Sequence, residues 1–190
     1  VGSEMCIRDR TDSMPRGLKV ATGLDALTHA IEGYITKGHC TISDMFHLEA
    51  IKLISENLRG AVQNTPEGRE GMALGQYIAG MGFSNVGLGI VHSMAHKTGA
   101  AFADYGAHII HGAANAMYLP KVIAFNAKDP EAKKRYGVIA DYMHLGGKDD
   151  DEKVALLIQY LRGMNDDLNI PHCIGHYGPC LLYTSPSPRD

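Results

Sequence analysis

GLGIVHSMAHKTGAAFADYGAHIIHGAAN, residues 87–115, places four histidines among small and apolar side chains: His92, His96, His108 and His111. His92 and His96 are four residues apart, so on a helix they project from the same face. Each pair of histidines could also be a pair of satisfied core residues. Four imidazoles in a stretch with almost no charge nevertheless indicate a bound metal ion, and they raise the question of where the remaining ligand lies.

An upstream segment, Asp25-Ala-Leu-Thr-His29, supplies a carboxylate and a further imidazole. These two residues are also four apart, and they lie in a predicted helix whose apolar neighbours favour burial. On its own such a pair is more often a hydrogen-bonded or solvated pair. Together with the downstream histidines it predicts a mixed oxygen and nitrogen site, which suits Fe(II) or Zn(II) and lacks the thiolates of a structural zinc site. Such a site with an open position fits Lewis-acid catalysis on an oxygen atom.

The spacing of apolar residues predicts helices throughout the interior of the chain. The first runs from Thr22, a candidate N-cap, to Lys37, and the second closes at Gly60. The predicted helices cover residues 22–37, 43–58, 70–84, 87–99, 108–126 with a bend at Pro120, 131–145 and 151–168. A turn is expected at 64–68 and a loop at 100–106. No alternating strand pattern occurs, so the predicted fold class is an all-α helical bundle.

The composition favours one globular domain that acts on small molecules. The chain has 190 residues, 45% of them hydrophobic, and a formal net charge of -3. No basic patch indicates nucleic acid or an anionic membrane, and no apolar run is long enough to span a bilayer. We therefore expect a cytoplasmic protein in which Cys40 and Cys173, the two cysteines away from the ends of the sequence, are reduced.

The two ends of the sequence share no pattern with the interior. If VGSEMCIRD is back-translated as GTG GGC TCG GAG ATG TGT ATA AGA GAC, the reverse complement read out of frame encodes LLYTSPSP, which occurs in the C-terminal segment. Two ends of one gene should not be reverse complements. We therefore predict that residues 1–10 and 180–190 are translated sequencing adapter and that residues 11–179 are an incomplete helical metal-binding domain.

Three segments, ATGLDALTHAIEGYIT, GMGFSNVGLGIVHSMAHKTGA and HGAANAMYLP, resemble the metal-binding segments of the iron-containing alcohol dehydrogenase family. The resemblance covers nearly all of residues 11–179. It implies the all-α C-terminal domain of a two-domain, dehydroquinate synthase-like dehydrogenase whose other domain is α/β. It further implies hydride transfer between a primary alcohol or its aldehyde and a nicotinamide cofactor.

Carried over by position, the resemblance implies that the metal ligands are Asp25, His29, His92 and His111. It places His96 near the nicotinamide, as a candidate for proton relay, and Phe83 at the substrate pocket. The connection from His96 to the HGAAN motif is longer than in most relatives, which leaves His108 as an alternative to His111.

The resemblance implies Fe(II), or Zn(II), together with NAD or NADP. No strand followed by a glycine-rich phosphate loop occurs, so no residue is assigned to the nucleotide, which relatives hold mainly on their N-terminal domain. We expect a small alcohol or aldehyde substrate, a homo-oligomer for the full-length form, and no dehydrogenase activity for this chain alone. The alternatives are a dehydroquinate synthase-like or other metal-dependent lyase, and a non-catalytic helical module.

Overall fold

Helices are the regular elements of residues 11–103 and 108–177, the part of the chain that the computed structural model describes. The α-helices are α2 (Arg16–Ile35), α3 (Thr41–Val62), α4 (Pro66–Val86), α5 (Ile90–Ala103), α6 (His111–Asn126), α7 (Pro130–Tyr142) and α8 (Asp150–Asp167), and a 3-10 helix follows at Ile174–Tyr177. No strand occurs in these residues. The predicted all-α bundle is therefore confirmed.

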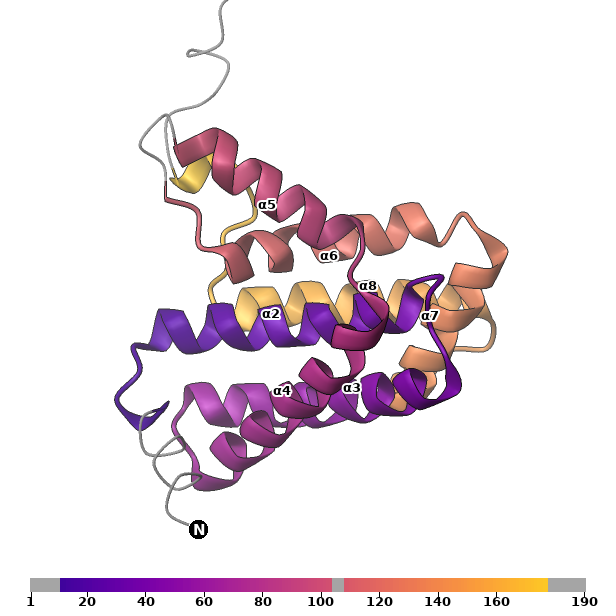
Figure 1. Cartoon of the computed structure of the whole chain (residues 1–190), viewed down its shortest axis with the longest axis horizontal. Coiled ribbons are helices and arrows are strands. Elements are labelled where there is room, and N and C mark those ends of the chain that lie inside the picture. The colour runs from indigo at the N-terminus through magenta and orange to yellow at the C-terminus, as the bar shows by residue number, and fades with distance from the viewer. Residues whose placement is uncertain (1–10, 104–107, 178–190) are drawn as a thin grey trace, which may run out of the picture.

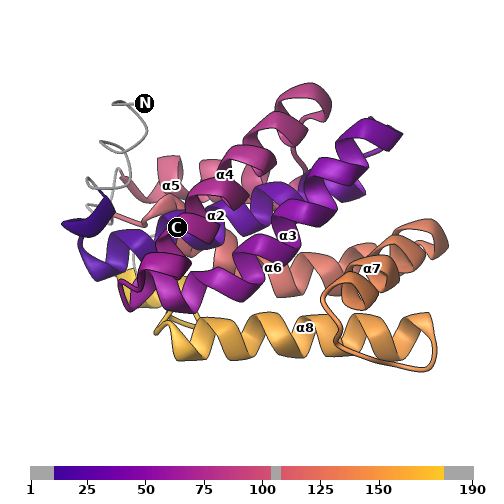
Figure 2. The same cartoon turned by 90° about the horizontal axis from the view of Figure 1, so that it is seen from below.

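Helix α2 lies in the middle of the bundle, between the α3–α4 pair and α6 (Figure 1). Helices α7 and α8 form a second pair beside α6, at one side of the molecule (Figure 2). A helix that packs on several sides must be apolar around most of its circumference, and α2 is buried at most positions from Val20 to Tyr34. Two polar residues of this stretch, Thr28 and Glu32, are therefore buried in the interior, and Asp25 and His29 are half-buried.

Helices α3 and α4 pack closely where a glycine of one lies against a glycine of the other. A Cβ atom on Gly68 would lie 2.4 Å from the carbonyl carbon of Gly60, so neither helix tolerates a larger residue at this crossing without moving. The predicted end of the second helix at Gly60 is wrong, since α3 continues to Val62. Gly60 allows close helix packing and does not end its helix. The predicted turn at 64–68 is shorter than expected, because α4 already begins at Pro66. The Thr65 hydroxyl caps this helix by accepting a hydrogen bond from the Gly68 N–H at 3.2 Å.

Several other boundaries differ from the predicted ones. Thr22 is not an N-cap but lies inside α2, where its hydroxyl donates to the carbonyl of Leu18 at 2.8 Å. Gly87 adopts a φ of 79° that ends α4, so α5 begins only at Ile90. Helix α5 then extends to Ala103, through the whole described part of the predicted loop, and α6 begins at His111 rather than at residue 108.

The Arg135 side chain ties the C-terminal end of α2 to α3 and α7. Its guanidinium stacks over the Tyr34 ring at 4.0 Å, donates to the Tyr34 carbonyl and pairs with Asp44 at 2.8 Å. Carbonyls in the last turn of a helix lack partners within that helix. A cation from a distant helix here satisfies one of them and opposes the negative end of the α2 dipole.

One histidine, His47 on α3, is buried completely in the core without a hydrogen-bond partner for either ring nitrogen. The ring fits between α2 and α4, because a Cβ on Gly33 or on Gly82 would lie within 2.5 Å of its Nε2 atom. Burial, offset in part by Asp44 and reinforced by Arg135, lowers the pKa of His47 to about 4. His47 is therefore a neutral core side chain at neutral pH.

Three sequence-based expectations bear on the surface and the ends. Among the described residues, no helix has the length and hydropathy that a bilayer-spanning segment needs. Cys40 and Cys173 are free and exposed. The predicted adapter segments, 1–10 and 180–190, lie outside the described residues.

We predict that Gly112→Ala is strongly destabilising. A Cβ atom there would lie 1.9 Å from the carbonyl oxygen of Ala21, at the crossing of α6 and α2. Such overpacking costs about 1–3 kcal/mol, so the free energy of unfolding measured in urea should fall by that amount. Gly163→Ala in α8 is the matched control: its Cβ meets no atom within 4 Å, and we expect a gain of about 0.5–1 kcal/mol from helix propensity.

The buried imidazole of His47 also predicts how acid destabilises the fold. Between pH 6.5 and about 4 the unfolded chain binds a proton at His47 that the folded chain does not, so stability falls as the pH falls. The stability lost through His47 reaches about 3 kcal/mol at the low end of this pH window. Urea unfolding at pH 7.5, 6 and 5 should show a shallower loss for His47→Leu than for wild type. Replacement of an exposed histidine, His172→Leu, is the control. If the free energy of unfolding of His47→Leu fell with pH as steeply as that of wild type, the prediction would be wrong.

Candidate metal centre

The centre begins with two side chains one turn apart on α2 and one from α5. Asp25 and His29 share a face of α2, and His92 lies in the first turn of α5. One ligand atom from each of these residues lies within 4.8 Å of the others. The rings of His29 and His92 stack with centroids 4.3 Å apart. The structure thus brings one carboxylate and two imidazoles close together, although His92 follows Asp25 by 67 positions in the sequence.

The Nε2 atom of His92 is buried and makes no hydrogen bond. The nearest acidic atom is Oδ1 of Asp25 at 3.4 Å. A buried polar atom without a partner costs free energy, and such atoms in native folds call for an explanation. The position of this nitrogen, next to a carboxylate and a second imidazole, is the one expected for an atom that binds a cation.

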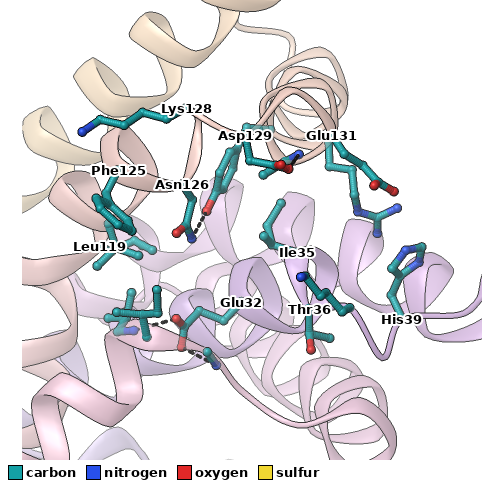
Figure 3. A pocket seen from close by; sticks show the side chains of 18 residues that line it. Glu32, Ile35, Thr36, His39, Leu119, Phe125, Asn126, Lys128, Asp129 and Glu131 are labelled. Atoms are coloured by element: carbon teal, nitrogen blue, oxygen red, sulfur yellow. Dashed lines mark hydrogen bonds between the residues drawn. The ribbon is translucent and has the colours of Figure 1, made fainter.

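The other ring nitrogen of His92 is held by Glu32, a buried carboxylate one turn beyond His29 on α2. Nδ1 of His92 donates to Oε2 of Glu32 at 2.7 Å. Glu32 also accepts hydrogen bonds from the backbone N–H groups of Gly89, Val91 and His92, as Figure 3 shows in part. The carboxylate thereby caps the start of α5 and fixes the His92 tautomer that leaves Nε2 free for a metal.

His111 approaches the same carboxylate from the first residue of α6. Its Nε2 atom lies 3.6 Å from Oδ1 of Asp25, and its ring centroid lies 5.5 Å from that of His92. Asn115, one turn further along α6, donates from Nδ2 to Asp25 at 2.5 Å and contacts Nε2 of His111 at 3.1 Å. The fourth side chain assigned by resemblance is therefore at the centre, although it lies outside the tightest group of three.

The remaining sequence-predicted residues fall into two groups. The His96 ring is exposed and lies 4.6 Å from the His111 ring, while the Phe83 ring stacks on His29 with centroids 4.4 Å and planes 12° apart. Both therefore border the candidate ligands. His108 is exposed, and no described contact joins it to the centre. The geometry supports His111 over His108.

Charges within the centre shift the pKa values of its members in opposite directions. Burial lowers the pKa of His29 and of His111. Burial also opposes the charged form of His92, but the Asp25 carboxylate beside Nε2 and the Glu32 carboxylate bonded to Nδ1 outweigh it and raise its pKa to about 9. Burial opposes ionisation of Asp25 as well, yet its contacts with His92, His29 and Asn115 keep its pKa below the usual value. Without an ion, a proton on His92 balances the buried carboxylates.

The residues present fit a divalent ion. Three imidazoles and one carboxylate converge from α2, α5 and α6, and the buried unpartnered Nε2 of His92 is among them. Nitrogen and oxygen donors without thiolates suit Fe(II) or Zn(II) in a site that keeps an open position. The exposed fraction of the His111 side chain, 37%, leaves one side of the centre accessible.

A large cleft lies elsewhere in the described structure. It has a volume of about 980 Å³ and is lined by residues of α2, α5, α6 and α7 (Figure 3). Glu32 borders it, but none of the four candidate ligands does. The candidate metal centre and this cleft are therefore separate features of the described residues, and Glu32 borders both.

Two residues of the centre were not predicted from the sequence, namely Glu32 and Asn115. Glu32 follows His29 by three residues, so it shares the face of α2 that carries Asp25 and His29. Asn115 follows His111 by four residues on α6 in the same way. A polar side chain at helical spacing from a candidate ligand, within an otherwise apolar segment, is the signal that could have identified both.

Comparisons of the sequence with known proteins agree on one family. The sequence profile of the Fe-containing alcohol dehydrogenase family, C-terminal, matches residues 19–179. Lactaldehyde reductase of Escherichia coli K12 is 45% identical over 163 residues, which is 86% of this chain and 41% of that protein. The NADPH-dependent butanol dehydrogenase of Clostridium saccharobutylicum is 45% identical over 167 residues, 88% of this chain and 41% of that protein.

Solved structures agree with these relatives. The structure of the iron-containing alcohol dehydrogenase from Thermococcus thioreducens superposes with a TM-score of 0.79 at 31% identity, covering 91% of this chain and 42% of that one. The chain thus spans about 41% of the length of the curated relatives that it matches.

We predict that Glu32→Gln weakens metal binding without unfolding the chain. The amide can still accept hydrogen bonds at the start of α5, but the charge that orients and polarises His92 is lost. Loss of an outer carboxylate of this kind costs about 10- to 100-fold in metal affinity. Calorimetric titration with Zn(II) measures the effect, with Glu56→Gln at an exposed position of α3 as the matched control. Equal affinities for wild type and Glu32→Gln would contradict the role given to Glu32.

Proposed function

Because the chain belongs to the Fe-containing alcohol dehydrogenase family, we propose that it forms the metal-binding part of an oxidoreductase that transfers hydride between a primary alcohol or its aldehyde and a nicotinamide cofactor. The metal ligands in this proposal are Asp25, His29, His92 and His111. The metal is Fe(II), with Zn(II) as the alternative, and the cofactor is NAD or NADP.

One observation carries the proposal more than any other. Three helices, α2, α5 and α6, bring three imidazoles and a carboxylate together around the buried, unpartnered Nε2 atom of His92. Packing alone does not account for a buried ring nitrogen without a hydrogen bond that lies beside a carboxylate and a second imidazole. A divalent ion in this position would act as a Lewis acid on the substrate oxygen.

The chain's own side chains then have separate tasks. Asp25 and Glu32 provide negative charge on two sides of His92, so the site favours a cation. Phe83 forms an apolar wall over His29 and would orient the carbon chain of a small alcohol while excluding water. His96 is exposed beside His111 and can move a proton between the site and solvent.

Hydride transfer needs more than these residues. The nicotinamide supplies the redox chemistry, and we place its main binding surface in the part of the relatives that this chain does not span. We therefore expect metal binding, but no dehydrogenase activity, from the 190-residue chain alone. The proposal further includes a domain at residues 11–179, a cytoplasmic location and a homo-oligomeric full-length enzyme.

The proposal predicts a specific pattern of metal loss. After reconstitution with Fe(II) under anaerobic conditions and removal of free ion, wild type should retain about one equivalent by mass spectrometry of the metal, as a four-residue site implies. Asp25→Asn and His111→Ala each remove a ligand, so their affinity should fall at least about tenfold. His108→Ala is the matched control, because its side chain is exposed, and it should retain the ion.

The same variants decide between the alternatives. Full retention of metal by His111→Ala, with loss by His108→Ala, would reassign the fourth ligand. A wild-type chain that binds no metal would contradict the proposed function and favour a non-catalytic helical module. NADH oxidation with propanal by the chain alone would contradict the location given to the nicotinamide site.

A further inference from the structure

The amide of Asn115 is completely buried between two of the candidate ligands, and neither the sequence pattern nor the resemblance assigns it a role. Its Nδ2 atom lies 2.5 Å from Oδ1 of Asp25 and 3.1 Å from Nε2 of His111. Its Oδ1 atom is buried and has no hydrogen-bond partner. One NH₂ group therefore contacts an oxygen ligand from α2 and a nitrogen ligand from α6.

The orientation of this amide follows from Asp25. An ionised carboxylate has no proton and can only accept hydrogen bonds. The amide atom that faces Asp25 must therefore be the nitrogen, and the oxygen must take the opposite, unpartnered position. The orphaned Oδ1 is thus the consequence of placing both N–H groups toward the centre.

The tautomer of His111 follows in turn. An amide nitrogen donates but does not accept, so Nε2 of His111 can pair with Nδ2 of Asn115 only through its lone pair. The proton of the neutral ring then resides on Nδ1. In the metal-free centre the Nε2 lone pair accepts from Asn115, so an ion bound at Nε2, 3.6 Å from Oδ1 of Asp25, would take the place of that hydrogen bond.

We propose that Asn115 is a positioning residue whose single NH₂ group sets both the orientation of the Asp25 carboxylate and the ligating tautomer of His111. The inference rests on the proposed function in that both partners are taken as metal ligands. Leaving a buried carbonyl oxygen unpaired costs about 1–3 kcal/mol, so the amide lowers stability while it prepares the site. Removal of the amide should accordingly harm the site more than the fold.

The tautomer itself provides a test that needs no metal. Long-range ¹H–¹⁵N NMR of the metal-free 190-residue chain at pH 8 distinguishes rings protonated on Nδ1 from rings protonated on Nε2. We expect His111 to be protonated on Nδ1 in wild type and to shift mostly to Nε2 in Asn115→Leu. Asn115→Ser serves the same purpose if the leucine variant does not fold, and Ser55→Ala, which removes another buried polar side chain, is the control.

The second measurement is the affinity for Co(II), followed by its visible absorption. We expect Asn115→Leu to weaken binding by about 10- to 100-fold and to change the absorption spectrum, while Ser55→Ala changes neither. A variant that keeps the Nδ1 tautomer of His111, or that binds Co(II) within twofold of wild type with the same spectrum, would overturn the inference. If wild type binds no Co(II) but the tautomer shifts as expected, the role of Asn115 toward His111 stands and the proposed function fails.

Discussion

A buried carboxylate at the start of α5 is the constraint on which the rest of the centre depends. Glu32 is 6% exposed, and removing such a charge from water is costly unless hydrogen bonds replace the lost solvation. Three backbone N–H groups and the His92 ring provide those bonds. Because the same contacts join α2 to the first turn of α5, the position of His92 is set by a residue that is not itself a candidate ligand.

The centre and the fold therefore have common determinants. Helix α2 carries a ligand pair and Glu32 through the middle of the bundle, and α6 crosses its backbone closely enough that only a glycine fits at position 112. That crossing brings His111 and Asn115 to Asp25. A shift of α6 along α2 would separate the nitrogen donors on one helix from the carboxylate on the other.

Much of this arrangement can be predicted from the sequence, and the rest depends on contacts between helices. The apolar spacing predicts all seven α-helices of the described residues, and the four-residue spacing of Asp25 and His29 predicts that they share a face. Motif resemblance adds His92 and His111, and the structure brings these residues together. Spacing alone does not show that Gly60 packs against another helix instead of ending its own.

The clamp made by Arg135 has a consequence for how the bundle forms. It joins positions 101 residues apart, so α7 must be present before the guanidinium reaches the Tyr34 carbonyl. Contacts of such separation form late, because the entropy of closing the intervening loop has to be lost first. During synthesis the α3–α4 hairpin can pack on α2 early, whereas the end of α2 stays open until α7 emerges. The clamp is therefore among the late contacts of this protein, and it closes the end of α2 only five residues beyond His29.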